Sequence, residues 1–212
     1  MGGTQAGEFN GRVGAEIIPR DRKFGDKRFG WSLIHDQRLS EHWRGQLDLG
    51  YVSDRDYLDD FGDTLGAESA DHVPQMAKLE YQRSHQLLPG DDFKLGLLFS
   101  DFQIIDPLID KEDDPYARLP ELTLDWHPGM AGSLLESDVA AVWTRFDHPI
   151  AARSVGDRLN LRPGVRINAG REYGFLRPRL ELDLISYRLD RRSDGEAWHS
   201  SSVVPVFSVD SG

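Results

Sequence analysis

Hydrophobic and polar side chains alternate along most of the chain with a period of two residues. In residues 42–53, HWRGQLDLGYVS, one parity carries Trp43, Leu47, Leu49 and Tyr51, and the other carries Arg44, Gln46 and Asp48. Successive side chains of a β-strand point to opposite faces of a sheet, so this segment is expected to be a strand with one apolar and one polar face. A half-buried strand of a soluble protein has this pattern, and so does a membrane strand with lipid on one side and water on the other.

The same pattern recurs and predicts an all-β protein without a convincing amphipathic helix. Ten strands are expected, at residues 7–18, 28–36, 42–53, 73–86, 92–105, 116–126, 133–146, 157–168, 173–188 and 201–209. Most run to about 9 to 14 residues, whereas strands of globular proteins centre on about five or six. The length of the strands therefore favours the membrane alternative.

The connections between these strands alternate strictly between long and short. The long polar ones contain PRDRKFGDK, DRDYLDDFGDTLGAESADH, PLIDKEDD, DHPIAARSVG and DRRSDGEAWHS, and the short ones contain DQRLSE, LLPGD, HPGMAG and AGRE. Outer-membrane barrels have short periplasmic turns and longer extracellular loops, because neighbouring hairpins open to opposite sides of the membrane. We therefore expect an antiparallel up-and-down meander of about ten strands that belongs to a transmembrane β-barrel.

Aromatic residues collect near both ends of the expected strands. Trp43, Phe93, Trp126 and Tyr173 lie beside short turns, and Phe29, Tyr51, Phe99, Phe146 and Tyr187 lie towards long loops. Membrane–water interfaces select two such aromatic girdles. The girdle is assigned to Trp43, Tyr51, Phe93, Trp126, Tyr173 and Tyr187. The alternative explanation is that aromatic residues simply favour strands.

The opposite parity predicts a polar face towards a watery lumen. Its expected members are Arg44, Asp48, Lys78, Glu80, Arg158, Arg162, Arg166, Glu181 and Asp183. The apolar face is expected to join Trp43, Leu47, Leu49 and Tyr51 with Ala77, Leu79 and Tyr81. A register slip by one residue would move charges into lipid, at about 2 to 4 kcal/mol for each Lys or Arg near the midplane.

Two local irregularities are expected. The apolar parity of 92–105 changes between Phe99 and Phe102, which a β-bulge near Ser100–Asp101 would explain. In the hairpin RLNLRPGVRINAGREYGFLRPRLELDL a tight turn near Gly170 would bring Arg158 and Arg162 opposite or diagonal to Glu181 and Asp183. At least one Arg–carboxylate contact is expected among these four residues. Both prolines of the hairpin are expected at edge-like or bulged positions, because proline cannot donate to the ladder.

Composition narrows the functional classes. The 212-residue chain has a formal net charge of -11, which argues against a sequence-independent nucleic-acid binder. It contains no cysteine, which removes disulfides, thiolate metal sites and cysteine nucleophiles. No apolar run approaches the roughly 18 residues of a membrane-spanning helix.

Catalytic and metal-binding patterns are weak. Asp71–His72 and Asp147–His148 lie in expected extracellular loops, where an Asp–His pair can activate water, as in omptin-like outer-membrane proteases. The acidic loop 54–63 lacks the order of an EF-hand, and the histidines lack a zinc spacing. No catalytic residue, metal or cofactor is assigned. An omptin-like hydrolase and a soluble carbohydrate-binding β-sandwich are kept as alternatives.

Six segments, in order along nearly the whole chain, resemble the LptD family of lipopolysaccharide-assembly proteins. They are IIPRDRKFGDKRF (17–29), YVSDRDYLDDFGD (51–63), YARLPELTLDW (116–126), RLNLRPGVRI (158–167), FLRPRLELDLISYRL (175–189) and SSVVPVFSVDSG (201–212). The last has Ser201 or Ser202 where the family usually has arginine.

The resemblance implies that residues 1–212 are the early part of a very large outer-membrane barrel domain. The chain would then be an open segment of a large transmembrane β-barrel, with unpaired edges at its first and last strands. The family's N-terminal periplasmic jellyroll and its C-terminal barrel strands would be absent from this chain, and so would the cysteines that join them. The implied function is the insertion of lipopolysaccharide into the outer leaflet of a Gram-negative outer membrane. The implied partners are outer-membrane lipids, an LptE-like plug lipoprotein, and an LptA-like periplasmic bridge that the absent N-terminal domain would contact.

Overall fold

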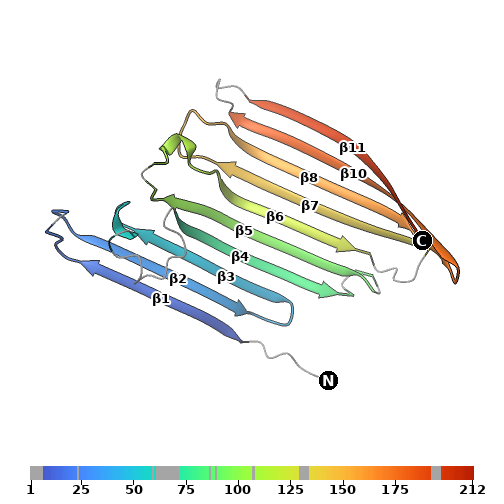
Figure 1. Cartoon of the computed structure of the whole chain (residues 1–212), viewed down its shortest axis with the longest axis horizontal. Helices are drawn as coiled ribbons and strands as arrows, with labels where there is room; N and C mark the ends of the chain where they lie inside the picture. Colours follow the sequence, from blue (N-terminus) through green and yellow to red (C-terminus); the bar gives the residue numbers. More distant parts are fainter. Residues whose placement is uncertain are drawn as a thin grey trace. The chain divides into compact units, whose positions relative to one another are not determined.

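The computed structural model in Figure 1 describes residues 7–22, 24–58, 60, 72–85, 87–88, 90–106, 108–128, 134–191 and 197–212. The strands of these ranges are β1 (Phe9–Ile18), β2 (Arg28–Arg38), β3 (Trp43–Val52), β4 (His72–Ser84), β5 (Asp92–Ile104), β6 (Ala117–His127), β7 (Leu135–Asp147), β8 (Val155–Ile167), β9 (Ala169–Arg171), β10 (Gly174–Arg191) and β11 (Trp198–Ser211). A short 3-10 turn, η1 (Lys111–Asp113), precedes β6. Within those ranges, none of the helical segments combines the length and apolar character needed to cross a lipid bilayer.

The strands form one sheet with the order β1-β2-β3-β4-β5-β6-β7-β8-β10-β11, and β9 pairs with β10 off this path. Each strand of the path lies beside its neighbours in sequence, as the colour gradient of Figure 1 shows. Within the described ranges β1 and β11 pair on one side only, so the sheet is not closed. The predicted all-β, up-and-down and open architecture is confirmed.

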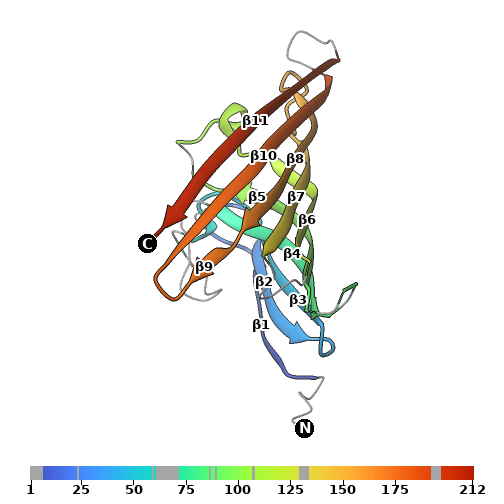
Figure 2. The same cartoon turned by 90° about the vertical axis from the view of Figure 1, so that its right-hand side faces the viewer.

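The strand β9 is the one addition to the ten expected strands. It pairs antiparallel with the beginning of β10, from Gly174 opposite Arg171 to Leu176 opposite Ala169, and Figure 2 shows this tight hairpin. Between β8 and β9, the backbone N–H of Asn168 donates to the carbonyl of Leu134 at 2.8 Å. This bond extends the pairing of β7 with β8 by one residue. The strand β9 then forms within the stretch AGRE, where a turn was expected.

The chain divides into two compact units, which are described separately. Unit 1 comprises Met1–Leu79, Leu98–Leu119 and Asp147–Ile150, and unit 2 comprises Glu80–Leu97, Pro120–Phe146 and Ala151–Gly212. In unit 1, the register of β2 against β3 places Trp31 opposite Tyr51 and Leu33 opposite Leu49. Directly opposed residues point to the same side, so these aromatic and aliphatic residues share one face.

Unit 1 also contains a small buried cluster at the end of β3. Its members are Val52, Tyr57, Leu58, Val73 and Ile105. The side-chain amide of Gln103 donates to the carbonyl of Val52 at 2.7 Å and accepts from its N–H at 3.0 Å. The Gln103 amide thus satisfies both the N–H and the carbonyl of Val52, as the backbone of a neighbouring strand would. Tyr57 and Leu58, in the loop after β3, pack against this end of the strand.

In unit 2, the backbone pairing between β8 and β10 is interrupted next to Pro163. Pairs continue up to Glu181 opposite Gly164 and resume at Leu184 opposite Leu161. Pro163 has no N–H to donate, so the pairing fails there although both strands continue. The expectation of an edge-like or bulged position is wrong for Pro163, which lies in an interior strand and opposes Val139 of β7.

Candidate functional site

The candidate site in unit 2 is a row of polar side chains across β7, β8 and β10. Gly164 lies opposite Asp138 of β7 on one side and Glu181 of β10 on the other. The next row places Arg166 between Glu136 and Arg179. Opposed residues share a face, so the expected polar residues Arg166 and Glu181 do lie on the same side of the sheet.

Arg179 links the three strands through its guanidinium. It donates to both carboxylate oxygens of Asp138 at 2.6 and 2.8 Å and to Glu181 at 2.7 Å. Asp138 belongs to β7 and Arg179 to β10, so the side chain reaches across the intervening strand β8. A bidentate Arg–carboxylate pair is geometrically specific, and this one can fix the relative register of the two strands.

Gly164 gives Arg179 the room for this crossing. A Cβ at this position would lie 2.6 Å from Nη2 of Arg179 and 2.9 Å from Oδ2 of Asp138. Any other residue at 164 would displace one end of the ion pair. The glycine of the segment RLNLRPGVRI thus has a specific steric role beneath the arginine.

The expected contact of Arg158 or Arg162 with Glu181 or Asp183 does not form in the described part of the chain. The carboxylate of Glu181 is bound by Arg179, and that of Asp183 accepts a bond from Asn160 at 3.0 Å. The predicted register and shared face are correct, but the predicted pairing is wrong. Arg179 is nearer because it projects from the same strand as Glu181, two residues away, on the same face.

Two residues of the expected aromatic ring near the long loops face the polar side. Tyr187 lies directly opposite Arg158, and the guanidinium of Arg158 lies 5.2 Å from the ring centre of Phe146. Tyr187 and Phe146 therefore belong to the face of the polar residues. Assigning Tyr187 to a lipid-facing girdle is inconsistent with this register and is corrected.

Three of the other expected girdle residues, Trp43, Tyr51 and Phe93, keep the apolar parity of their own strands. Trp43 and Tyr51 alternate with Arg44 in β3, and the Phe93 ring meets the Tyr81 ring edge-on at 6.2 Å. Tyr173 is almost fully exposed in the turn after β9. Their location at membrane interfaces stays a prediction.

In unit 1, the expected polar residue Arg44 bonds across the β2–β3 pair. Its guanidinium bonds Asp36 through Nε at 3.1 Å and Nη2 at 2.6 Å, and Gln46 donates to the same carboxylate at 2.6 Å. Asp48 follows on the same parity and lies opposite Ile34. Within β4, Lys78 and Glu80 alternate with Leu79. That these residues face a watery lumen stays a prediction.

Among the described residues of unit 1, Arg28 is the most buried charged side chain, and no periodic pattern in the sequence marks it. Its side chain is 1% exposed. The guanidinium bonds Asp54 at 2.7 and 3.0 Å, Asp60 at 2.6 Å and Asp21 at 3.2 Å. The ring centres of Phe24 and Tyr57 lie 5.0 and 5.5 Å from it. We call Arg28, Asp21, Asp54, Asp60 and Tyr57 the Arg28 cluster.

The Arg28 cluster joins two of the quoted family-like segments. Asp21 and Arg28 come from IIPRDRKFGDKRF, and Asp54, Tyr57 and Asp60 come from YVSDRDYLDDFGD. The sequence does contain a signal for this cluster: a basic loop segment and an acidic loop segment each lie next to the end of an expected strand. Pairing them required knowing that β2 and β3 bring both loops to the same end.

Burial also changes the acidity of the Tyr57 hydroxyl group. This hydroxyl donates to Oε2 of Glu16 at 3.1 Å. Burial, followed by this bond to a carboxylate, raises the pKa of Tyr57 to about 12. The phenol is therefore neutral and a hydrogen-bond donor through the physiological range.

The Asp147–His148 pair does not have the geometry of a catalytic dyad. His148 is buried, and its Nε2 donates to the carbonyl of Asp114 at 3.1 Å while its Nδ1 accepts from the N–H of Ile150 at 3.1 Å. The Asp147 carboxylate accepts from the backbone N–H of His148. Asp71 and much of the acidic loop 54–63 lie outside the described residues. Across the described ranges, no group of three or more His, Asp or Glu side chains could hold a metal ion.

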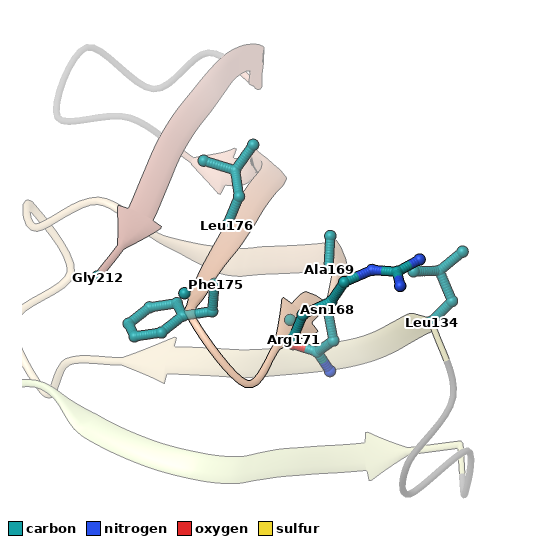
Figure 3. A pocket seen from close by; sticks show the side chains of 9 residues that line it. Leu134, Asn168, Ala169, Arg171, Phe175, Leu176 and Gly212 are labelled. Atoms are coloured by element: carbon teal, nitrogen blue, oxygen red, sulfur yellow. The ribbon is translucent and has the colours of Figure 1, made fainter.

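An open pocket of about 610 Å³ lies at the β9–β10 hairpin of unit 2. Figure 3 shows the side chains that line it. Its lining is Leu134, Asn168, Ala169, Gly170, Arg171, Gly174, Phe175, Leu176 and Gly212. The lining is mostly apolar or main chain, with Arg171 as its one charged side chain. It offers no constellation of acid, base and nucleophile.

Comparison with known proteins identifies the same family as the resemblance of the six segments. The family model LptD, described as LPS transport system D, matches residues 26–212. The chain is 31% identical to the LPS-assembly protein LptD of Chromobacterium violaceum over 207 residues, which are 97% of this chain and 25% of that protein.

Further relatives carry the same name. The LPS-assembly protein LptD of Nitrosospira multiformis is 30% identical over 93% of this chain and 21% of its own length. That of Acinetobacter baumannii is 28% identical over 95% of this chain and 25% of its own length. The chain thus spans about a quarter of the curated relatives it matches. Because the family model covers most of its residues, the chain belongs to the LptD family.

Proposed function

We propose that this chain forms part of the wall of an outer-membrane β-barrel. The complete barrel would insert lipopolysaccharide into the outer leaflet of the outer membrane of a Gram-negative bacterium. Residues 1–212 would form an early part of the barrel domain. The role is transport, in which no covalent bond is made or broken by this segment.

The observation that carries the proposal is the segregation of the two faces of the β7–β8–β10 sheet. One face carries Asp138, Glu181 and Arg179, joined by ion pairs across strands. The other carries exposed Leu159, Val165 and Leu180. A membrane strand needs apolar side chains towards lipid, and polar side chains towards water can contact sugars and phosphates.

The alternative functions lack support. A sandwich needs two face-packed sheets, whereas the described strands form one sheet. An omptin-like hydrolase needs a free Asp–His pair, whereas the ring nitrogens of His148 are both bonded to main-chain groups. The names of the relatives, LPS-assembly protein LptD, support lipopolysaccharide as the cargo.

The proposed partners follow from the family. An LptE-like lipoprotein would occupy the lumen of the complete barrel and contact the polar face. An LptA-like periplasmic bridge would deliver the glycolipid to the N-terminal domain of the complete protein. Outer-membrane lipids would contact the apolar face.

The test is site-specific photo-crosslinking in the complete protein in its own host. A photo-reactive amino acid is placed at Arg162 or at Val165, which lie three residues apart in β8 with opposite parity. We expect lipopolysaccharide or the plug protein on Arg162, and phospholipid or the acyl chains of the outer leaflet on Val165. Identical adducts at both positions, or only soluble proteins at Val165, would contradict the proposal.

A further inference from the structure

The turn between β4 and β5 is held by an unusual number of hydrogen bonds. The N–H of His85 donates to the carbonyl of Asp91 at 2.8 Å, and the N–H of Gly90 donates to Nδ1 of His85 at 2.5 Å. His85 has a φ of 59°, the left-handed conformation that non-glycine residues adopt rarely. Ser84 and Asp92 add a side-chain bond of 2.6 Å at the base of the turn.

The centre of this turn is the carboxylate of Asp91, which is 0% exposed. Its Oδ2 accepts from the N–H of Leu87 at 2.9 Å, the N–H of Leu88 at 3.2 Å and Nε1 of Trp126 at 3.3 Å. A buried carboxylate is stable only when such donors replace its lost hydration. Asp91 thereby fixes the backbone of the two leucines beside the indole ring.

The bond to Trp126 also shows on which face the turn lies. Trp126 has the parity of Leu122 and Leu124 in β6, opposite to Glu121. Glu121 accepts a bond from Thr144 at 3.0 Å, and Thr144 lies opposite Arg158 on the polar face. Trp126 and the bound carboxylate of Asp91 are therefore on the apolar face of the sheet.

Leu87 and Leu88 leave large apolar surfaces uncovered at this place. Their side chains are 59% and 41% exposed. Turns are normally polar, and here two adjacent leucines lie between Tyr81 and Phe93, whose rings are in contact on the same hairpin. Leucine beside Trp and Tyr is the composition that seats a segment at the boundary of acyl chains and head groups.

We propose that this turn is a membrane-interface anchor. Leu87 and Leu88 insert into the phospholipid leaflet on the short-turn side of the sheet, and Asp91 is the positioning residue that holds them beside Trp126. The occupant is phospholipid, because the turn lies on the apolar face beside aromatic residues. The inference rests on the proposed outer-membrane location, so the experiment tests location and anchor separately.

The experiment uses the complete protein in vesicles of phosphatidylethanolamine and phosphatidylglycerol. An environment-sensitive fluorescent amino acid replaces Leu88, Leu180 or Glu41 in separate variants. Leu180 is an exposed apolar-face residue within β10 and reports the membrane location. Glu41 is an exposed polar residue of another short turn, between β2 and β3. Lipids brominated near the carboxyl end or near the methyl end of the acyl chain quench shallow or deep probes.

We expect the shallow bromine to quench position 88 at least about twofold more than position 41, and the deep bromine to quench position 180. If position 180 is quenched but position 88 is quenched no more than position 41, the anchor is refuted while the membrane location is retained. No quenching at 180 overturns the location and the anchor together. Protection of position 88 from both bromines and from aqueous iodide means that protein covers the turn, which also overturns the anchor.

The role of Asp91 has its own readout. In Asp91→Ala the quenching at position 88 should fall towards that of position 41, while that at position 180 stays unchanged. Asp91→Asn keeps one acceptor oxygen and should restore part of the quenching. Unchanged quenching at 88 in the alanine variant overturns the positioning role, and the signal at 180 verifies that the barrel is folded in each case.

Discussion

Replacing Arg28 by Met should open the loops that surround it without unfolding the strands. Methionine fills much of the volume of the arginine stem but provides no donors. Asp21, Asp54 and Asp60 would then face one another without the guanidinium that binds all three. The perturbation removes one partner of a buried ionic group, which is the most costly way to break it.

The size of the effect follows from the exposure of the partners. The side chains of Arg28, Asp21 and Asp54 are 1%, 14% and 12% exposed, whereas that of Asp60 is 33% exposed and can regain water. Breaking a buried pair costs about 3–5 kcal/mol, and we expect about 3 kcal/mol because Asp60 is relieved by solvent. This corresponds to a loop-opening constant about 100-fold larger.

The assay is amide hydrogen exchange of the complete protein in detergent micelles or nanodiscs. The reporter is the N–H of Ser53, which donates to the carbonyl of Phe29 at 2.9 Å and joins the two loop bases. Its exchange should accelerate about 100-fold in Arg28→Met, because it depends on the same local opening. Peptides from the middle of β2 should exchange at the wild-type rate.

Arg44→Met is the matched control. Arg44 also binds an aspartate through two nitrogens, yet it is 56% exposed and its partner Asp36 is 37% exposed. An exposed pair contributes about 0.2–1 kcal/mol, so exchange near Arg44 should change less than about fivefold. Equal effects of the two substitutions, or an unchanged Ser53 amide in Arg28→Met, would refute the argument that burial makes the Arg28 cluster a structural tie.

The pKa of Tyr57, raised from 10.0 to about 12, favours the neutral phenol in the fold, so its stabilising contribution is complete below pH 10 and is lost as the pH rises through about 12. Spectrophotometric titration of the wild type minus Tyr57→Phe should show a phenol near 12, and only the wild type should lose loop protection in that range. Gly156→Ala should destabilise the sheet by about 1–3 kcal/mol in chemical denaturation, because the new Cβ would collide with the backbone carbonyl oxygen of Arg188, which cannot move aside as a side chain can. Gly164→Ala should cost less, since its Cβ meets only the ends of two flexible side chains, and a larger loss at 164 than at 156 would contradict this ranking.

Period-two patterning was sufficient to predict most of the fold. It located β2, β3 and β5 to within two residues at each end, because polar connections bound each alternating segment. It also predicted the parity of the hairpin formed by β8 and β10, where the short turn couples the two strands. Local alternation and turn length together determine a meander of neighbouring strands.

The pattern could not predict which charged groups would bind each other. Alternation places Arg158, Arg162 and Arg179 on one face, and only the three-dimensional register shows that Arg179 reaches Asp138 over Gly164. Nor does alternation identify Arg28, whose partners come from two loops without periodicity. Tyr187 was misplaced because closeness to a loop was used where parity decides the face.

The Arg28 cluster also bears on the order in which the protein can be assembled. Its bonds join Arg28 to Asp21, Asp54 and Asp60, at sequence separations of 7, 26 and 32 residues. The bond between Arg179 and Asp138 spans 41 residues and needs β7, β8 and β10 to be present together. Contacts of short separation form early, because little chain entropy is lost in closing them. Arg28 can therefore fasten the strands β1 to β3 to one another before the strands that follow Asp60 are in place.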